Sequence, residues 1–219
     1  MNKQIQLQLA MDGAAEGRTV EQAIEIIKNL RDYVDVIEVG TSFMFRYGVE
    51  AIKAIKTQFP EKVILADMKI MDGGGHFSKL GCDYGADIIT VLGVSDDKTI
   101  KDAITEAHKQ NKLVMVDLLR CTDIESRIAQ MEELGADYVC VHSGVDMQKE
   151  YSSSLLSELD IAVGCAKKAK VAVAGGINVA SIQSIVDQKP DLIIVGGGIL
   201  NQTDYLTPAK EISKAIRGV

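Results

Sequence analysis

Four carboxylates and one lysine stand where short apolar runs of this 219-residue sequence end. Asp12, Glu38, Asp67 and Asp117 each close such a run, and Lys69 follows Asp67 by two positions. Carboxylates that converge in a site of low dielectric repel one another unless a cation neutralises them. On an extended strand, residues two apart point to the same side, so we expect Lys69 beside Asp67. Each carboxylate alone also fits a solvated strand end in a salt bridge, but the set favours a site.

A divalent metal ion would be a second cation for this group. The candidate ligands are carboxylate oxygens, and no Cys or His pair stands with them. Oxygen ligands of this kind favour Mg²⁺ over Zn²⁺, so the pattern predicts Mg²⁺.

One of the three histidines, His142, also ends an apolar run. An imidazole there suits proton transfer near neutral pH, so we expect His142 in the site. His108 lies in a helical pattern beside Lys109, which predicts a surface position. His76 follows a glycine-rich turn, and we expect it to be structural.

Two glycine-rich turns follow the last two apolar runs. They contain Gly175-Gly176 and Gly196-Gly197-Gly198. Glycine lets backbone N–H groups approach phosphate oxygens with no Cβ in the way. One such turn also fits a tight bend alone, but two together predict a site for a phosphorylated small molecule.

Eight β-branched runs would position all of these residues. They span 5–11, 34–39, 62–67, 87–93, 112–117, 137–142, 170–175 and 191–196. Their nearly continuous apolar character is typical of parallel strands that are buried on both faces. Segments with helical spacing lie between them, for example 19–33, 48–59, 97–110 and 124–135. Gly-Ala-Asp recurs at 85–87 and 135–137, which indicates a weak internal repeat of two strand–helix units.

This alternation predicts an α/β fold, a (β/α)₈ TIM barrel that forms a single domain over residues 1–219. An open doubly wound sheet is the alternative. That fold usually carries GxGxxG after its first strand, where this chain has MDGAAEG. In a barrel, active sites lie at the carboxyl ends of the strands, where the residues above are found.

Composition excludes several classes of function. The net charge is −7 and no dense basic run occurs, which disfavours nucleic-acid binding. No apolar stretch is long enough to span a membrane, and the start of the chain reads as a strand rather than a signal peptide. The four cysteines form no CxxC pair. We expect reduced thiols in a cytoplasmic protein.

The pattern DxKxxD at residues 67–72 resembles the signature of the orotidine 5′-monophosphate decarboxylase suprafamily. Within it, the chain is most similar to the group of 3-hexulose-6-phosphate synthase and 3-keto-L-gulonate-6-phosphate decarboxylase. The similarity covers essentially the whole chain. It is carried by LQLAMD (7–12), VIEVGT (36–41), ILADMKIMDGG (64–74), ITVLG (89–93), VHSG (141–144), VAVAGGI (171–177) and IIVGGGI (193–199).

Four positions separate the two activities of this group. The decarboxylase pattern has Glu, Arg, Thr and Arg where this chain has Asp117, Val145, Ala174 and Gly197. All four follow the synthase pattern. Arg120-Cys121 and residues 201–204 are small departures from the synthase pattern. They affect what can be inferred about the substrate, but not about the core chemistry.

The resemblance implies a lyase that catalyses the reversible aldol condensation of D-ribulose 5-phosphate with formaldehyde to D-arabino-3-hexulose 6-phosphate, through a 1,2-enediolate. It implies Glu38 and Asp67 as Mg²⁺ ligands, Lys69 as a further positive charge, and His142 with Asp117 in proton transfer. It also implies that Asp12 binds a substrate hydroxyl and that the phosphate is bound by Gly175, Gly176, Gly196 and Gly197. Finally, it implies a homodimer with shared active sites, in which Asp72 reaches into the active site of the neighbouring subunit.

Three alternatives stay open at this point. The first is 3-keto-L-gulonate-6-phosphate decarboxylase, which would use the same enediolate chemistry. The second is an isomerase barrel such as ribulose-phosphate 3-epimerase, which would need a His-rich metal site. The third is a non-catalytic sugar-phosphate sensor, which would have no use for a lysine held between carboxylates.

Overall fold

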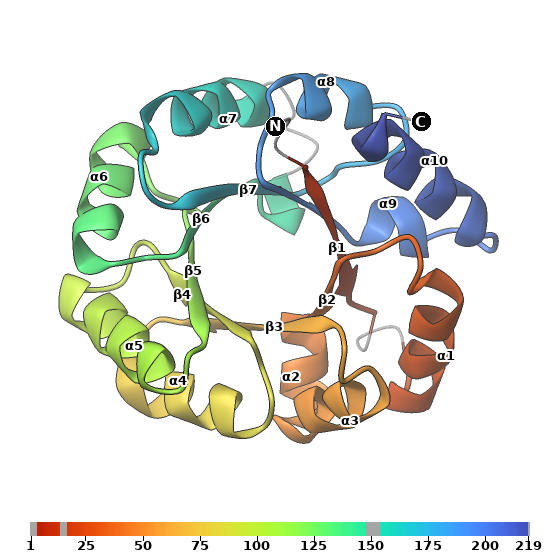
Figure 1. Ribbon diagram of the computed structural model, residues 1–219, viewed down its shortest axis with the longest axis horizontal. Coiled ribbons are helices and arrows are strands. Elements are labelled where there is room, and N and C mark those ends of the chain that lie inside the picture. Colours follow the sequence, from red (N-terminus) through yellow and green to blue (C-terminus); the bar gives the residue numbers. More distant parts are fainter. Residues whose placement is uncertain (1–3, 14–16, 148–153, 219) are drawn as a thin grey trace.

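The computed structural model describes residues 4–13, 17–147 and 154–218. Eight parallel strands close into a barrel in sequence order, with the helices outside it (Figure 1). The strands are β1 (Gln6–Met11), β2 (Val36–Val39), β3 (Val63–Ile70), β4 (Ile88–Leu92), β5 (Leu113–Asp117), β6 (Tyr138–His142), β7 (Lys170–Ala174) and β8 (Leu192–Val195). The predicted TIM barrel is confirmed and the doubly wound sheet is excluded. That the domain takes in all of residues 1–219 stays a prediction.

The helices form the outer ring. They are α1 (Val20–Leu30), α2 (Thr41–Tyr47), α3 (Glu50–Gln58), α4 (Gly74–Asp83), α5 (Asp97–Lys109), α6 (Ile124–Leu134), α7 (Ser154–Cys165), α8 (Ile182–Asp187), α9 (Gly197–Leu200) and α10 (Leu206–Arg217), with a 3₁₀ turn, η1 (Val145–Met147). In α5 the apolar stripe Ile100, Ala103, Ile104 and Ala107 is buried, as the helical spacing predicts. No helix in the described ranges has the length and apolar character to cross a lipid bilayer.

Alternation along each strand builds two apolar layers. Residues such as Ile37, Ile64 and Val139 belong to the layer between barrel and helices. Their neighbours in sequence belong to a smaller cluster inside the barrel, made of Ala10, Val36, Leu65, Ile88, Met115, Tyr138, Cys140, Ala172, Ala174, Leu192 and Ile194. Because both faces are buried, the strands read as nearly continuous apolar runs.

A four-fold device joins the amino ends of the strands. An aspartate stands just before each even-numbered strand. Its carboxylate accepts the backbone N–H of one residue on the preceding strand. Its own backbone N–H donates to the carbonyl of that same residue. The pairs are Asp35 with Leu7, Asp87 with Ile64, Asp137 with Val114 and Asp191 with Val171, with side-chain bonds of 2.8–2.9 Å. Two of these aspartates belong to the Gly-Ala-Asp repeat, so the weak repeat in the sequence is half of a four-fold one.

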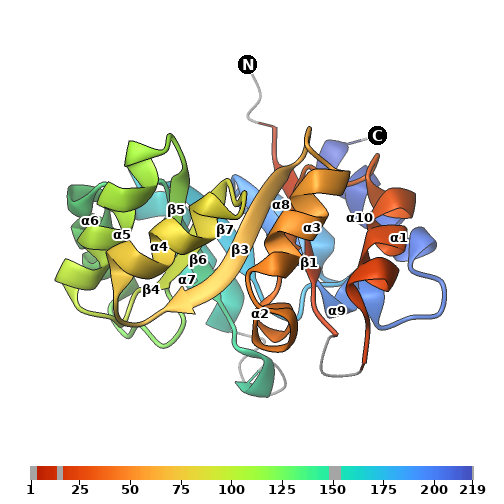
Figure 2. The ribbon, with the colours of Figure 1, turned by 90° about the horizontal axis from the view of Figure 1, so that it is seen from below.

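The opposite end of the barrel is built differently. Figure 2 shows the strands running towards its lower edge, where the arrowhead of β3 lies and where α2 and η1 project. In barrels of this kind, the active site lies at the carboxyl ends of the strands.

Candidate active site

The predicted site residues stand at the carboxyl ends of their strands. Glu38 lies on β2, Asp67 and Lys69 on β3, and Asp117 and His142 end β5 and β6. Three of the carboxylates, Glu38, Asp67 and Asp117, are no more than 7% exposed. Buried charges are costly unless they are paired, so their contacts decide what the site can do.

A chain of polar contacts links four of these residues. The Lys69 ammonium contacts Asp67 Oδ2 and lies 3.8 Å from Asp117 Oδ2. Asp117 Oδ2 is in turn 2.8 Å from His142 Nδ1, and its Oδ1 accepts the N–H of Leu119 at 3.0 Å. The structure thus brings together the lysine, two carboxylates and the imidazole that the sequence predicted would converge.

These contacts set the charge states. Burial alone would lower the pKa of Lys69, but the Asp67 and Asp117 carboxylates outweigh it and hold that pKa above its usual value. Burial would raise the pKa of Asp117, yet the hydrogen bond and charge of His142, together with the charge of Lys69, keep it below the usual value. At neutral pH the site therefore holds a charged lysine between two carboxylates.

The surroundings of Glu38 oppose its negative charge. Burial, and then repulsion by Asp67 and Asp12, raise the pKa of Glu38 well above its usual value. Its Oε2 accepts the side-chain N–H of Gln8 at 2.5 Å. Gln8 is fully buried, and its Oε1 has no hydrogen-bond partner among the described residues. The sequence reasoning missed Gln8. Residues two apart on a strand point to the same side, so its position two residues before the inward-facing Ala10 could have indicated it.

These features fit a divalent cation. A buried carboxylate repelled by two others would be stabilised by a nearby positive charge, and the donors are oxygen atoms. Across the described ranges, no group of three or more His, Cys, Asp or Glu side chains has the spacing of a metal site. Mg²⁺ is commonly held by one or two carboxylates, with waters and substrate oxygens completing its shell. Glu38 and Asp67 suit that pattern.

Strand β3 is longer than predicted and irregular. The apolar run predicted an end at Asp67, but the strand continues to Ile70. Ala66 pairs with Ile89 and Ile70 with Val91, so residues 67–69 lie opposite the single residue Thr90. Lys69 takes a left-handed backbone conformation with φ 44°. Lys69 does meet Asp67, but through this bulge rather than through the extended backbone that was expected.

Two threonines that the sequence reasoning missed hold the Asp67 carboxylate. The Thr41 hydroxyl lies 2.7 Å from Asp67 Oδ2 and 2.9 Å from the Asp67 carbonyl. The Thr90 hydroxyl donates to Asp67 Oδ1 at 2.9 Å and accepts the Lys69 N–H at 2.9 Å. The carboxylate is therefore held from two sides, by the first residue of α2 and by β4.

The glycine-rich turns lie at the same end of the barrel. Gly175 has φ 107°, and a Cβ there would lie 2.1 Å from the carbonyl oxygen of Ser143. Gly196 precedes α9, where the helical hydrogen bonds begin with the N–H of Ile199. The N–H groups of Gly197 and Gly198 come before that point, so they have no acceptor within the helix, and such groups at a helix start can bind an anion.

Asp12 and Asp72 are both exposed. Asp12 follows β1, and its Oδ1 accepts the Ser42 hydroxyl at 3.4 Å. It lies near enough to Glu38 to raise that residue's pKa. The Asp72 carboxylate accepts the N–H of Gly73 at 2.7 Å, and no contact with Lys69 of the same chain is seen.

Gly74, two residues after Asp72, allows two helices to pack closely. A Cβ on Gly74 would lie 1.9 Å from the carbonyl oxygen of Thr99, because α4 crosses α5 there at very short range. This crossing fixes where the loop that carries Asp72 leaves the barrel.

Comparisons with known proteins agree with this architecture. Residues 6–212 match the model of the orotidine 5′-phosphate decarboxylase / HUMPS family. A 3-hexulose-6-phosphate synthase from Bacillus subtilis is 44% identical over 212 residues, which cover 97% of this chain and 99% of that protein. The crystal structure of 3-hexulose-6-phosphate synthase from Salmonella typhimurium superposes with a TM-score of 0.91 at 41% identity, covering 97% of this chain and 98% of the other.

A more distant structure shares the fold. The crystal structure of KGPDC from Streptococcus mutans gives a TM-score of 0.88 at 24% identity and covers 98% of each chain. The family resemblance inferred from the motifs is confirmed. The protein is an enzyme, and the lyase class fits its synthase relatives. On its motifs, its fold and these matches, the chain belongs to the orotidine 5′-phosphate decarboxylase / HUMPS family.

Proposed function

We propose that this enzyme condenses D-ribulose 5-phosphate with formaldehyde to form D-arabino-3-hexulose 6-phosphate, reversibly. The observation that carries the proposal is the charged Lys69, held between Asp67 and Asp117 at the mouth of the barrel. Such a fixed positive charge suits an anion that develops during the reaction. The full-length similarity to synthases supports the choice of substrates.

His142 is suited to the proton transfers. Its Nδ1 donates to Asp117, so Nε2 carries the lone pair and can take the proton from C1 of the ketose phosphate. The resulting 1,2-enediolate attacks the carbon of formaldehyde and forms the new C–C bond. The formaldehyde oxygen then takes a proton, which returns His142 to its neutral form. Asp117 holds the imidazole in one orientation and stabilises its charged form.

We assign Glu38 and Asp67 as the residues that hold Mg²⁺. When bound, Mg²⁺ supplies Lewis-acid stabilisation of negative charge on the substrate oxygens. Lys69 adds a second positive charge from the chain itself, and we assign Asp12 to a substrate hydroxyl.

The phosphate is assigned to the two glycine-rich turns. The backbone N–H groups of Gly175, Gly176, Gly196 and Gly197 lie at the ends of β7 and β8 and at the start of α9. In barrels of this class, these loops commonly hold a phosphate group.

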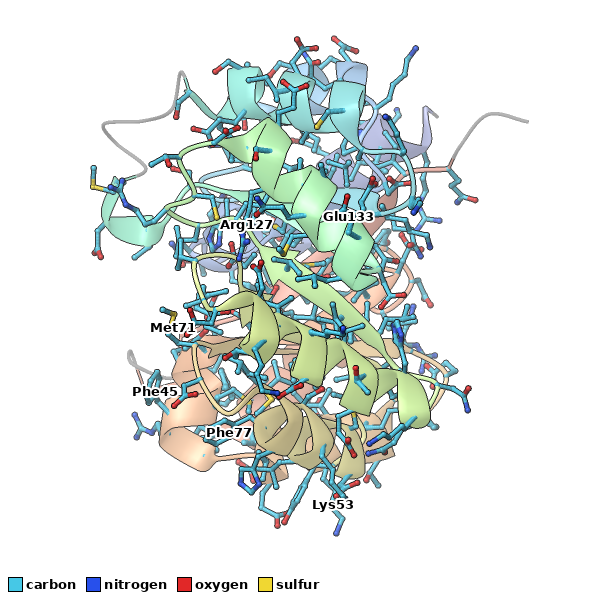
Figure 3. The ribbon with its side chains drawn as sticks, turned by 90° about the vertical axis from the view of Figure 1, so that its left-hand side faces the viewer. Phe45, Lys53, Met71, Phe77, Arg127 and Glu133 are labelled. Atoms are coloured by element: carbon cyan, nitrogen blue, oxygen red, sulfur yellow. The ribbon has the colours of Figure 1, made fainter. Side chains whose placement is uncertain are left out.

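We further propose a homodimer with shared active sites. Among the described residues of its own chain, Asp72 has no partner in the site, so a neighbouring subunit is where its carboxylate would act. Phe45, Met71 and Phe77 are 89%, 53% and 42% exposed, and they lie on one flank of the molecule near this loop (Figure 3). Exposed apolar side chains gathered in this way are typical of a protein interface.

The four cysteines are free thiols, which supports a cytoplasmic location.

A paired assay tests the proposed reaction. One arm follows formaldehyde loss with D-ribulose 5-phosphate, and the other follows CO₂ release from 3-keto-L-gulonate 6-phosphate. We expect the first to dominate, to stop with EDTA and to return with Mg²⁺. Dominant CO₂ release would instead assign the decarboxylase reaction, and activity that survives EDTA would refute the metal assignment.

A further inference from the structure

Thr90 of β4 stands opposite the irregular part of β3. Residues 67–69 of β3 face this one residue, since Ala66 pairs with Ile89 and Ile70 with Val91. A bulge of this kind removes regular ladder bonds, and backbone groups left unpaired in a buried place are costly. The N–H of Lys69 is one of those groups.

The Thr90 side chain takes the place of the missing ladder bond. Its Oγ1 accepts the Lys69 N–H at 2.9 Å and donates to Asp67 Oδ1 at 2.9 Å. One hydroxyl therefore satisfies the bulged backbone and the carboxylate at once. Thr90 is 3% exposed, so water does not readily replace it in either bond.

The backbone of Lys69 needs this support. A non-glycine residue at φ 44° is strained, and such a conformation persists only when its surroundings hold it. The bulge is also what brings the Lys69 ammonium onto Asp67. We infer that Thr90 is a positioning residue, whose hydroxyl holds the β3 bulge so that Asp67 and Lys69 meet in their working arrangement.

Thr41 provides a contrast within the same site. Its hydroxyl bonds the carboxylate and carbonyl of Asp67, but not the N–H of Lys69. Loss of the Thr41 hydroxyl should therefore disturb Asp67 and leave the Lys69 amide protected. Loss of the Thr90 hydroxyl should disturb both.

The test compares Thr90→Val, which is nearly the same shape without the hydroxyl, with Thr90→Ser, which keeps the hydroxyl. The inference rests on the proposed function for its catalytic part, so one readout is independent of turnover: amide hydrogen exchange at Lys69. We expect exchange about tenfold faster in Thr90→Val, near wild type in Thr90→Ser and unchanged in Thr41→Val.

Turnover supplies the second readout. We expect Thr90→Val to lower kcat about 10- to 100-fold, as is usual for residues that orient site groups, and Thr90→Ser to restore most of it. KM for D-ribulose 5-phosphate should stay nearly constant, because Thr90 is not assigned a substrate contact. Ser213→Ala is the control, because Ser213 is also buried and its hydroxyl accepts from Arg217 on α10, outside the barrel.

Each outcome decides. Unchanged Lys69 exchange in Thr90→Val, or equal loss in Thr90→Ser, would overturn the inference. If the wild-type protein shows no synthase activity, the proposed function fails. The positioning role of Thr90 is then tested by amide hydrogen exchange at Lys69 alone. If Thr90→Val does not fold, Thr90→Ala makes the same comparison with less bulk.

Discussion

Replacing Lys69 with alanine separates catalysis from stability in this site. The Lys69 side chain is 26% exposed and contacts Asp67, while Asp117 lies 3.8 Å away. At an effective dielectric constant of about 20, the attraction across 3.8 Å alone is about 4 kcal/mol. Removing one partner of a buried pair typically costs about 3–5 kcal/mol, because the other charge is left unpaired.

The partial exposure of Lys69 places the expected loss at the lower end, about 3 kcal/mol of unfolding free energy. For a chain of this length, that lowers Tm by about 6–12 °C, measured with EDTA so that no metal offsets the repulsion. Removing one stabiliser of a developing anion costs about 10²- to 10³-fold in kcat. We therefore expect a folded protein with turnover reduced at least that far in the formaldehyde assay.

Lys56→Ala is the matched control. Lys56 has the same side-chain exposure, 26%, and pairs with Asp87 at 2.8 Å, but at the amino end of the barrel. Asp87 keeps Lys112 at 2.7 Å, so the loss of stability should be smaller. Turnover should be unchanged. Near-wild-type turnover in Lys69→Ala would refute the charge-stabilisation argument, and an equal loss in Lys56→Ala would assign the effect to folding.

Three further outcomes are expected. Burial and the neighbouring carboxylates raise the pKa of Glu38 in the folded state, so its ionisation opposes folding as pH rises above the unfolded pKa of about 4.3. Without metal, the Glu38→Gln variant should therefore have a higher Tm than wild type at pH 7 to 8, and Mg²⁺ should raise that Tm only slightly. A Tm below that of wild type at this pH would contradict the argument. Mixing Lys69→Ala with Asp72→Ala should restore about a quarter of wild-type turnover if subunits exchange freely and sites are shared, since half the dimers then hold one intact site; no recovery despite confirmed exchange would count against shared sites. Gly175→Ala should lower Tm and raise KM for D-ribulose 5-phosphate, because a Cβ there meets the Ser143 carbonyl at 2.1 Å; an unchanged KM would remove this turn from the phosphate site.

The sequence by itself determined the barrel and the rim. Apolar runs and helical spacing are local patterns, and eight alternations leave little choice of fold. Because parallel strands in a barrel all end at one rim, the position of Glu38, Asp117 or His142 at the end of a run was enough to place it there. The Gly-Ala-Asp repeat indicated repeated strand–helix units, and the structure shows that its two aspartates, Asp87 and Asp137, also join neighbouring strands.

Only the tertiary structure decided how the rim residues meet. The two-residue period of a strand holds along one chain segment, but the register between strands depends on how side chains pack across the barrel. The bulge at Lys69, the two bonds of Thr90 and the contact of Gln8 with Glu38 all depend on that register. Nothing local to residues 67–69 indicates a partner on β4, because hydrogen bonds between distant residues are fixed only once the strands are side by side.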